Sequence, residues 1–184
     1  MTASENTLAS GKFFRFWSAA NEPRAVVLIS HGLGEHSGRY EHVAAALTAD
    51  NLDVYAPDHI GHGKSPGKPA YIDRFSDLTS GVSELRDHIR RHHAGLPVIL
   101  IGHSMGGLIA IRLALGAHAD YAGLILTGPL LGQPEAPSRL QVMLLRVLSV
   151  LAPKVKAIEI DASAVSRDPA VVSDYIADPL THHY

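Results

Sequence analysis

The feature that most constrains the fold is an apolar run that meets a glycine-rich turn and then a helix-forming segment. PVILI, residues 97–101, leads directly into GHSMGG, residues 102–107, and LIAIRLAL follows. An apolar run without polar alternation predicts a strand covered on both faces, as in a parallel sheet. A strand that gives way to a helix over so few residues requires a sharp bend, and Ser104 lies within it.

Further segments repeat this alternation of strand and helix. Apolar runs at 25–30, 52–56 and 123–127 predict three more buried strands. Helical spacing of apolar residues occurs between them, in the sets Val43 and Leu47; Leu78, Val82, Leu85 and Ile89; and Leu108, Ile111 and Leu115. The order predicts an α/β fold with a mostly parallel sheet and right-handed crossovers. KFFRFWS, residues 12–18, is expected to form an antiparallel edge strand.

The pattern changes after Pro129, where residues 132–137 indicate a loop and 138–154 a helix capped by Ser138. This helix has apolar residues on almost every side. One interpretation is a helix packed on the core; the other is a lid whose apolar surface meets lipid or an acyl chain. We therefore divide the chain into a core, residues 1–133, and a helical cap segment, residues 134–184.

Composition excludes several classes of protein. The chain has 184 residues, enough for one well-buried core, and its 46% hydrophobic and 18% charged residues are typical of globular proteins. A net charge of −2 provides no field that attracts nucleic acid, so no nucleic-acid partner is expected. The lack of cysteine excludes disulfides and thiolate metal sites.

Targeting signals are also not recognisable. The amino terminus lacks the basic start and long apolar core of a signal peptide. The longest apolar run, 140–152, is interrupted by Gln141, Arg146 and Ser149 and is shorter than the roughly 20 residues of a spanning helix. We predict a cytoplasmic protein whose contact with membranes is at most peripheral.

GHSMG matches the pattern G-x-S-x-G, which is only moderate evidence by itself. Its position between a buried strand and a helix makes it much more specific. Gly102 and Gly106 leave room for a tight elbow, and Gly107 lets the helix pack closely. Ser104 is therefore the candidate nucleophile, and the amino terminus of the following helix favours negative charge beside it.

HGLGEH, residues 31–36, follows the strand at 25–30. Its three residues between His31 and Glu35 do not fit the H-x-x-E-H metal pattern, and its glycines are one residue too far apart for a dinucleotide loop. A flexible turn that offers a backbone N–H to the serine fits better. Leu33 and Met105 are the expected N–H donors of an oxyanion hole, and His31 is expected to be structural.

DHIGHGKS, residues 58–65, contains GKS but has Asp58 where a phosphate-binding loop needs glycine. His62 is expected to be held by local hydrogen bonds rather than to act as a base. Four further histidines are expected at the surface, namely His92, His93, His182 and His183. Two ligands do not make a metal site, so we expect neither a metal nor a cofactor.

Four motifs together, HGLGEHSGRY, YAPDHIGHGKS, GHSMGG and SRDPAVVSDYIADPLTHH, resemble the monoglyceride lipase family of the α/β-hydrolase fold. The resemblance covers nearly the whole chain. It implies an eight-stranded sheet with a helical cap, and hydrolysis of monoacylglycerols to glycerol and fatty acid. It implies Ser104 as nucleophile, the backbones of Leu33 and Met105 as oxyanion hole, and a cap that covers the acyl channel and touches membranes.

The chain departs from this family at its carboxyl end. The acid and the histidine of the family's triad follow the seventh and eighth strands, which are expected to be missing here because the chain ends in the cap. A substitute triad would pair His182 or His183 with an acid among Asp161, Asp168, Asp174 and Asp178. No apolar strand separates these residues. We therefore expect the base to lie outside this chain, and the chain alone to be nearly inactive.

Other readings of the function remain at this point. The same scaffold serves lysophospholipases and general carboxylesterases, and a non-catalytic fragment that acts as an assembly module is a different class. The strand at 123–127 would have an unpaired edge with apolar neighbours, which promotes association. The expected partners are thus a lipid ester and either a complementing carboxyl-terminal chain or a second copy.

Overall fold

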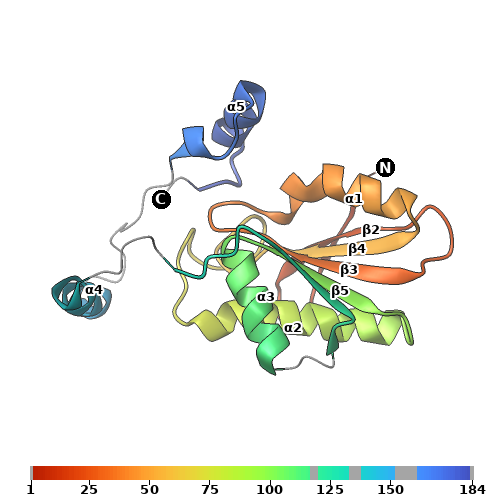
Figure 1. Ribbon diagram of the computed structural model, residues 1–184, viewed down its shortest axis with the longest axis horizontal. Coiled ribbons are helices and arrows are strands. Elements are labelled where there is room, and N and C mark those ends of the chain that lie inside the picture. The colour runs from red at the N-terminus through yellow and green to blue at the C-terminus, as the bar shows by residue number, and fades with distance from the viewer. Residues whose placement is uncertain (1, 117–119, 133–137, 152–160, 183–184) are drawn as a thin grey trace.

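The computed structural model describes residues 2–116, 120–132, 138–151 and 161–182. Within these residues the strands form one sheet of six, in the order β1-β2-β4-β3-β5-β6 (Figure 1). The strands are β1 Ser4–Thr7, β2 Phe13–Trp17, β3 Ala25–Ser30, β4 Leu52–Pro57, β5 Val98–His103 and β6 Gly123–Thr127. β4, β3, β5 and β6 are parallel, whereas β1 and β2 are antiparallel to their neighbours.

The predicted strands all form, with two corrections. β3 and β4 are buried along their whole length, as continuous apolar runs predict. β2 is antiparallel as expected, but the prediction of an edge strand is wrong, because β1 pairs with its outer side. β6 is not a buried strand: Leu124 and Ile125 are exposed, since β6 is the last strand on its side of the described sheet.

Helices cover both faces of the sheet (Figure 1). α1, Glu41–Ala49, lies on one face beside the cluster around Trp17 and Val54, while α2, Phe75–His92, and α3, Met105–Gly116, lie on the other. The predicted stripe of α2 is buried: Leu78, Val82, Leu85 and Ile89. The predicted stripe of α3 is wrong, because Met105, Ile109 and Leu113 face the core and Leu115 is 75% exposed.

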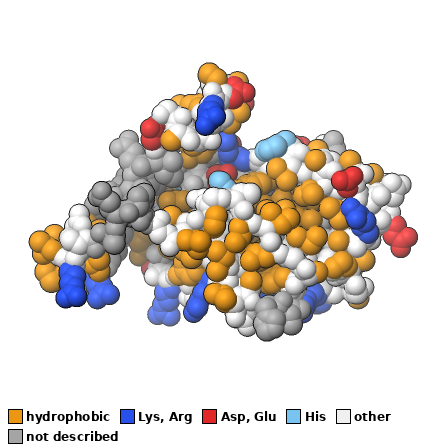
Figure 2. Space-filling model, viewed as in Figure 1, with side chains coloured by type: hydrophobic (Ala, Val, Ile, Leu, Met, Phe, Trp, Pro, Cys, Tyr) orange, Lys and Arg blue, Asp and Glu red, His pale blue; other side chains and the backbone are white. Residues whose placement is uncertain are grey.

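Apolar side chains remain at the surface near β6 and α3, on the face that Figure 2 presents. The large ones in this part of the chain are Leu115, Leu124, Ile125, Leu130 and Leu131. A sheet edge with such neighbours is able to pair with another strand.

α4, Arg139–Leu151, stands apart from the sheet (Figure 1). Ser138 caps it as predicted, since its Oγ accepts from the Gln141 N–H at 3.2 Å while Gln141 Oε1 accepts from the Ser138 N–H at 2.8 Å. Its apolar side chains are exposed, so α4 is not packed on the core: Leu140, Met143, Leu144, Leu145, Val147, Leu148 and Leu151. Most of the predicted 132–137 loop and the predicted helix end at 152–154 lie outside the described residues.

In the described ranges, no helix has the length and apolar character needed to cross a membrane.

Candidate active site

Ser104 lies between β5 and α3 with a φ of +51°, in the left-handed region that residues with a side chain rarely adopt. Backbone bonds hold it there. Its N–H donates to Thr127 O at 3.0 Å, and its carbonyl accepts from the N–H groups of Gly107, Leu108 and Leu130. This is the sharp bend that the sequence predicts.

The glycines of the motif are required by close approaches. A Cβ on Gly102 would lie 2.5 Å from Gly106 O, and a Cβ on Gly106 would lie 2.5 Å from His31 O. A Cβ on Gly107 would lie 2.8 Å from Cβ of Pro129. The elbow therefore fits only because these positions carry no side chain, which supports the roles predicted for the three glycines.

The loop after β3 borders the serine. A Cβ on Gly32 would lie 3.3 Å from Cβ of Ser104, so the loop passes directly beside the elbow. Among the described residues, the backbone N–H groups of Leu33 and Met105 donate no hydrogen bond. The predicted oxyanion hole requires backbone N–H groups that are not already bonded to another acceptor.

Three buried histidines underlie this loop, namely His31, His59 and His62. The His31 and His59 rings are 4.2 Å apart, and the His31 and His62 rings are 5.5 Å apart. Burial lowers the pKa of all three, and that of His62 to about 4, so they are neutral at pH 7. His62 Nδ1 bonds to Ile60 O at 3.0 Å, the local contact that the sequence predicts.

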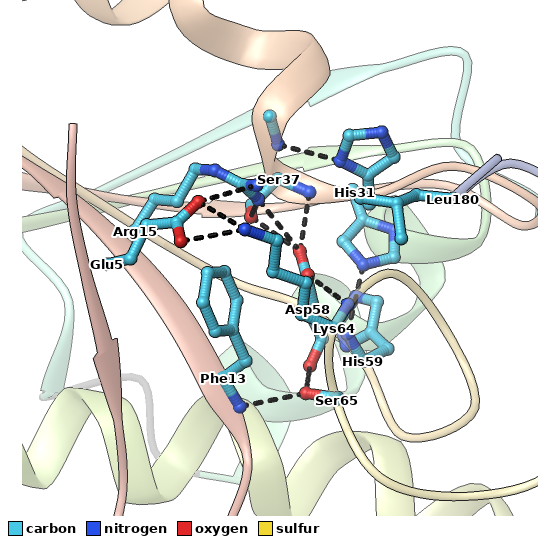
Figure 3. Close-up of polar contacts among 12 residues, drawn as sticks. Glu5, Phe13, Arg15, His31, Ser37, Asp58, His59, Lys64, Ser65 and Leu180 are labelled. Carbon is cyan, nitrogen blue, oxygen red and sulfur yellow. Dashed lines mark hydrogen bonds and ion pairs between the residues drawn. The ribbon is translucent and has the colours of Figure 1, made fainter. Parts of the chain in front are cut away.

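Asp58 connects three segments beneath the loop and has no exposed surface (Figure 3). Its Oδ1 accepts from the N–H of Ser37 at 2.8 Å and from Ser37 Oγ at 2.5 Å, and lies 3.7 Å from Nη1 of Arg15. Its Oδ2 accepts from the Lys64 N–H at 2.8 Å. No motif in the sequence predicts this role; the available signal is a charged residue that directly follows a buried strand.

The segment around α5, Pro169–Ala177, is bound to the same loop. Asp178 Oδ2 accepts from His36 Nε2 at 2.8 Å. The Gly34 carbonyl accepts from Tyr175 Oη at 3.3 Å and from the His182 N–H at 2.9 Å. The end of the predicted cap segment thus reaches the residue next to Leu33.

The acids of the substitute triad are mostly engaged in other ways. Asp161 and Asp168 accept from the N–H groups of Ser163 and Ala170 at the starts of a 3-10 turn and of α5. Asp178 is bound by His36, and Asp174 lines a cavity of about 490 Å³ beside Arg39 rather than Ser104. His183 lies outside the described residues.

In the described part of the chain, no side chain is hydrogen-bonded to the Ser104 hydroxyl. Within the described ranges Ser104 Oγ has no hydrogen-bond partner, and His103 Nδ1 is turned to Thr127. In the same ranges no group of three or more His, Cys, Asp or Glu residues is placed to hold a metal ion.

His93, expected at the surface, instead has Nε2 bonded to the Tyr55 hydroxyl at 2.8 Å.

The chain is similar to known lipases along most of its length. The chain is 40% identical over 169 residues to the human monoglyceride lipase, covering 91% of this chain and 56% of that protein. It is 41% identical over 167 residues to the monoacylglycerol lipase of Mycolicibacterium smegmatis, covering 91% and 60%. The chain therefore spans little more than half the length of these relatives.

A solved structure gives the same result. The monoacylglycerol lipase of Paleococcus ferrophilus is 32% identical, with a TM-score of 0.77, and the match covers all of this chain and 65% of that one. The α/β-hydrolase fold and the resemblance to monoglyceride lipases are thereby confirmed. The family model described as "Serine aminopeptidase, S33" matches residues 21–184. The chain therefore belongs to this family of α/β-hydrolases.

Proposed function

We propose that this chain carries the nucleophile and the oxyanion hole of a serine ester hydrolase that cleaves monoacylglycerols. The observation that carries the proposal is the elbow at Ser104, with its positive φ and with Gly32 packed against it. The N–H groups of Leu33 and Met105, which donate no hydrogen bond within the described part of the chain, support the oxyanion hole. The names of the relatives support the substrate class.

The proposed reaction uses one covalent intermediate. Ser104 Oγ attacks the ester carbonyl carbon and its proton passes to a histidine base, while the carbonyl oxygen becomes an oxyanion held by the N–H groups of Leu33 and Met105. Collapse breaks the bond to the glycerol oxygen, which takes the proton from the histidine. Water then attacks the acyl-enzyme, releases the fatty acid and restores the serine hydroxyl.

The base and its acid are proposed to lie in a carboxyl-terminal part of the whole protein. The lack of a partner for Ser104 Oγ among the described residues and the greater length of the relatives support this proposal. Triad members act as a unit, so a chain that lacks two of them loses on the order of 10⁶ in rate. We therefore expect the 184-residue chain by itself to be nearly inactive.

Residues 134–184 are proposed to form the cap over the acyl channel. The exposed apolar side chains of α4 support contact with the surface of a membrane, because a helix of this kind lies in the interface rather than spanning it. The contacts of Asp178 with His36 and of His182 with Gly34 would attach the other end of the cap to the active-site loop.

The unpaired side of β6 is proposed as the place where further chain is added. In the described sheet β6 has only β5 as neighbour, and Leu124 and Ile125 are exposed. A carboxyl-terminal part would pair there and complete the enzyme. A second copy pairing at the same edge is the alternative when that part is missing.

A fluorophosphonate probe, which reacts only with an activated serine, tests the proposal. We expect the probe to label Ser104 in the chain joined to its carboxyl-terminal part. We expect no labelling of the chain alone, and none of the joined protein that carries Ser104→Ala. Monoacylglycerol, lysophospholipid and a short-chain ester offered to the labelled form separate a monoacylglycerol lipase from a lysophospholipase or a carboxylesterase. An unlabelled serine in the joined protein favours a non-catalytic assembly module.

A further inference from the structure

The His31 imidazole has both ring nitrogens engaged. Nε2 accepts from the N–H of His59 at 3.0 Å, and Figure 3 shows the two residues in contact. Because Nε2 is the acceptor, the ring proton of the neutral imidazole is on Nδ1, which donates to Gly32 O at 2.8 Å. His31 has no exposed surface and its pKa is lowered by burial, so this neutral tautomer persists at pH 7.

The oxygen that His31 holds belongs to the same peptide unit as the N–H of Leu33. Peptide units are planar, and in a trans unit the carbonyl oxygen and the amide hydrogen point in opposite directions. The described chain has no cis peptide bonds. A hydrogen bond that fixes Gly32 O on the His31 side therefore fixes the Leu33 N–H on the opposite side.

This peptide unit needs a restraint. Gly32 has no side chain, so its ψ angle is free to turn over a wide range. Rotation of the unit by half a turn would exchange the positions of the Leu33 N–H and the Gly32 carbonyl, so that an oxygen would oppose the developing negative charge. The unit that precedes Gly32 is held separately, because Glu35 Oε1 accepts from the Gly32 N–H at 2.5 Å.

We propose that His31 is a positioning residue that sets the orientation of the Gly32–Leu33 peptide and thereby the strength of the oxyanion hole. The inference rests on the proposed function and adds to it a residue that does not touch the substrate. It gives the histidine a purpose in the reaction, where the sequence indicated only a structural one.

Two substitutions separate the contacts of the ring. An Asn side chain places its amide near the position of Nδ1, so His31→Asn retains a donor for Gly32 O. A Gln side chain places its amide near the position of Nε2, so His31→Gln retains the contact with the His59 N–H and loses the donor. Thermal unfolding compares the stability of both variants with that of the parent protein.

In the chain joined to its carboxyl-terminal part, we expect His31→Gln to lower kcat about 10²- to 10³-fold, as loss of an oxyanion donor does, with KM little changed. His31→Asn should restore kcat to within about tenfold of the parent, which a purely structural role would not predict. Equal kcat values for parent and His31→Gln overturn the inference.

Crystal structures of the two variants provide a readout that does not depend on activity. The Gly32–Leu33 peptide is expected to turn in His31→Gln and to keep its orientation in His31→Asn. An unchanged peptide in His31→Gln overturns the inference, whatever the activity. An unlabelled Ser104 in the parent protein overturns the proposed function, and the orientation of the peptide in the variants still decides the role of His31.

Discussion

The carboxylate of Asp178 accepts a 2.8 Å hydrogen bond from Nε2 of His36 and so joins the end of α5 to the loop after β3. His36 Nδ1 accepts from the Gly38 N–H at 3.1 Å, which leaves the proton on Nε2 to be donated. Burial is the largest single influence and raises the pKa of Asp178, but the hydrogen bonds from His36 and from the Leu180 N–H, together with the charge of Arg39, lower the net pKa below the usual 3.8. The contact favours the ionised carboxylate.

Asp178→Ala should therefore loosen the α5 segment. It removes the bond from His36 and a second bond from the Leu180 N–H. A charge-assisted hydrogen bond contributes about 1.5–3 kcal/mol, so amide exchange over residues 169–182 should rise at least about tenfold. Because the folded pKa is depressed, the contact persists above pH 3.8 and is lost as the pH falls below it. Exposed Asp174→Ala is the control, and equal exchange in both variants contradicts the prediction.

Gly106→Ala should prevent the elbow from forming. The new Cβ would lie against the backbone oxygens of Ser30 and His31, neither of which is the end of a flexible side chain. We expect a loss of about 3 kcal/mol in the free energy of unfolding, measured with urea. Gly116→Ala is the matched control on the same helix, since its Cβ meets nothing within 4 Å. A Gly106→Ala protein as stable as this control would show that the elbow adapts.

The fold was predictable wherever burial left a continuous apolar signal. β3 and β4 are buried on both faces, and both begin where their apolar runs begin. α3 shows the limit: nearly every residue from Met105 to Leu115 is apolar, so periodicity does not select the face that packs. Packing of the whole fold selects it, and buries Ile109 rather than Leu115.

Other features depend on contacts that no local pattern contains. β1 has the polar sequence SENT and all its residues are exposed, so it is a strand only because its backbone pairs with β2. Asp58 unites Arg15, Ser37 and Lys64, which are far apart in the sequence. The elbow at Ser104 was predictable because its glycines and its serine are close together in the sequence, although Gly106 and Gly107 are required by contacts with the distant residues His31 and Pro129.

The histidine cluster beneath the loop should make the protein sensitive to acid. A folded pKa of about 4 for His62, against 6.5 when exposed, means that the unfolded chain binds more protons below pH 6.5. Stability is therefore full above pH 6.5 and declines toward pH 4, by about 3 kcal/mol from His62. Urea unfolding at pH 7.5, 6 and 5 measures the decline. In His62→Gln the free energy of unfolding should fall less steeply between pH 7.5 and pH 5. A fall as steep as that of the parent protein would show that His62 does not cause the acid sensitivity.

The apolar surface of α4 should be needed for membrane contact. Leu144→Gln combined with Leu148→Gln keeps good helix formers and removes two exposed apolar side chains. Burial of a leucine contributes about 1.5–3 kcal/mol, so binding to phosphatidylcholine vesicles, measured by co-sedimentation, should fall at least tenfold. Thermal stability should not change. Leu115→Gln on α3 is the control, and it should bind vesicles as the parent does; equal binding by all three proteins argues against the cap contact.

The edge of β6 should cause self-association of the isolated chain. Ile125→Lys places a charge on this edge, which blocks strand pairing. Sedimentation velocity over a range of concentrations should show association of the parent chain and a shift of Ile125→Lys toward monomer. Asn6→Lys on the short polar β1 is the control at the opposite edge. A parent chain that stays monomeric at every concentration contradicts the prediction.

The backbone of Ser104 is bound to β6 and to the segment that follows it. Its N–H is bonded to Thr127, the last residue of β6, and its carbonyl to the N–H of Leu130 just beyond. The bend at Ser104 is thus hydrogen-bonded to the outermost strand on that side of the described sheet, and loss of order in this strand would loosen the bend. The position of Ser104, and with it the proposed role of this residue as nucleophile, therefore depends on what pairs with the outer edge of β6.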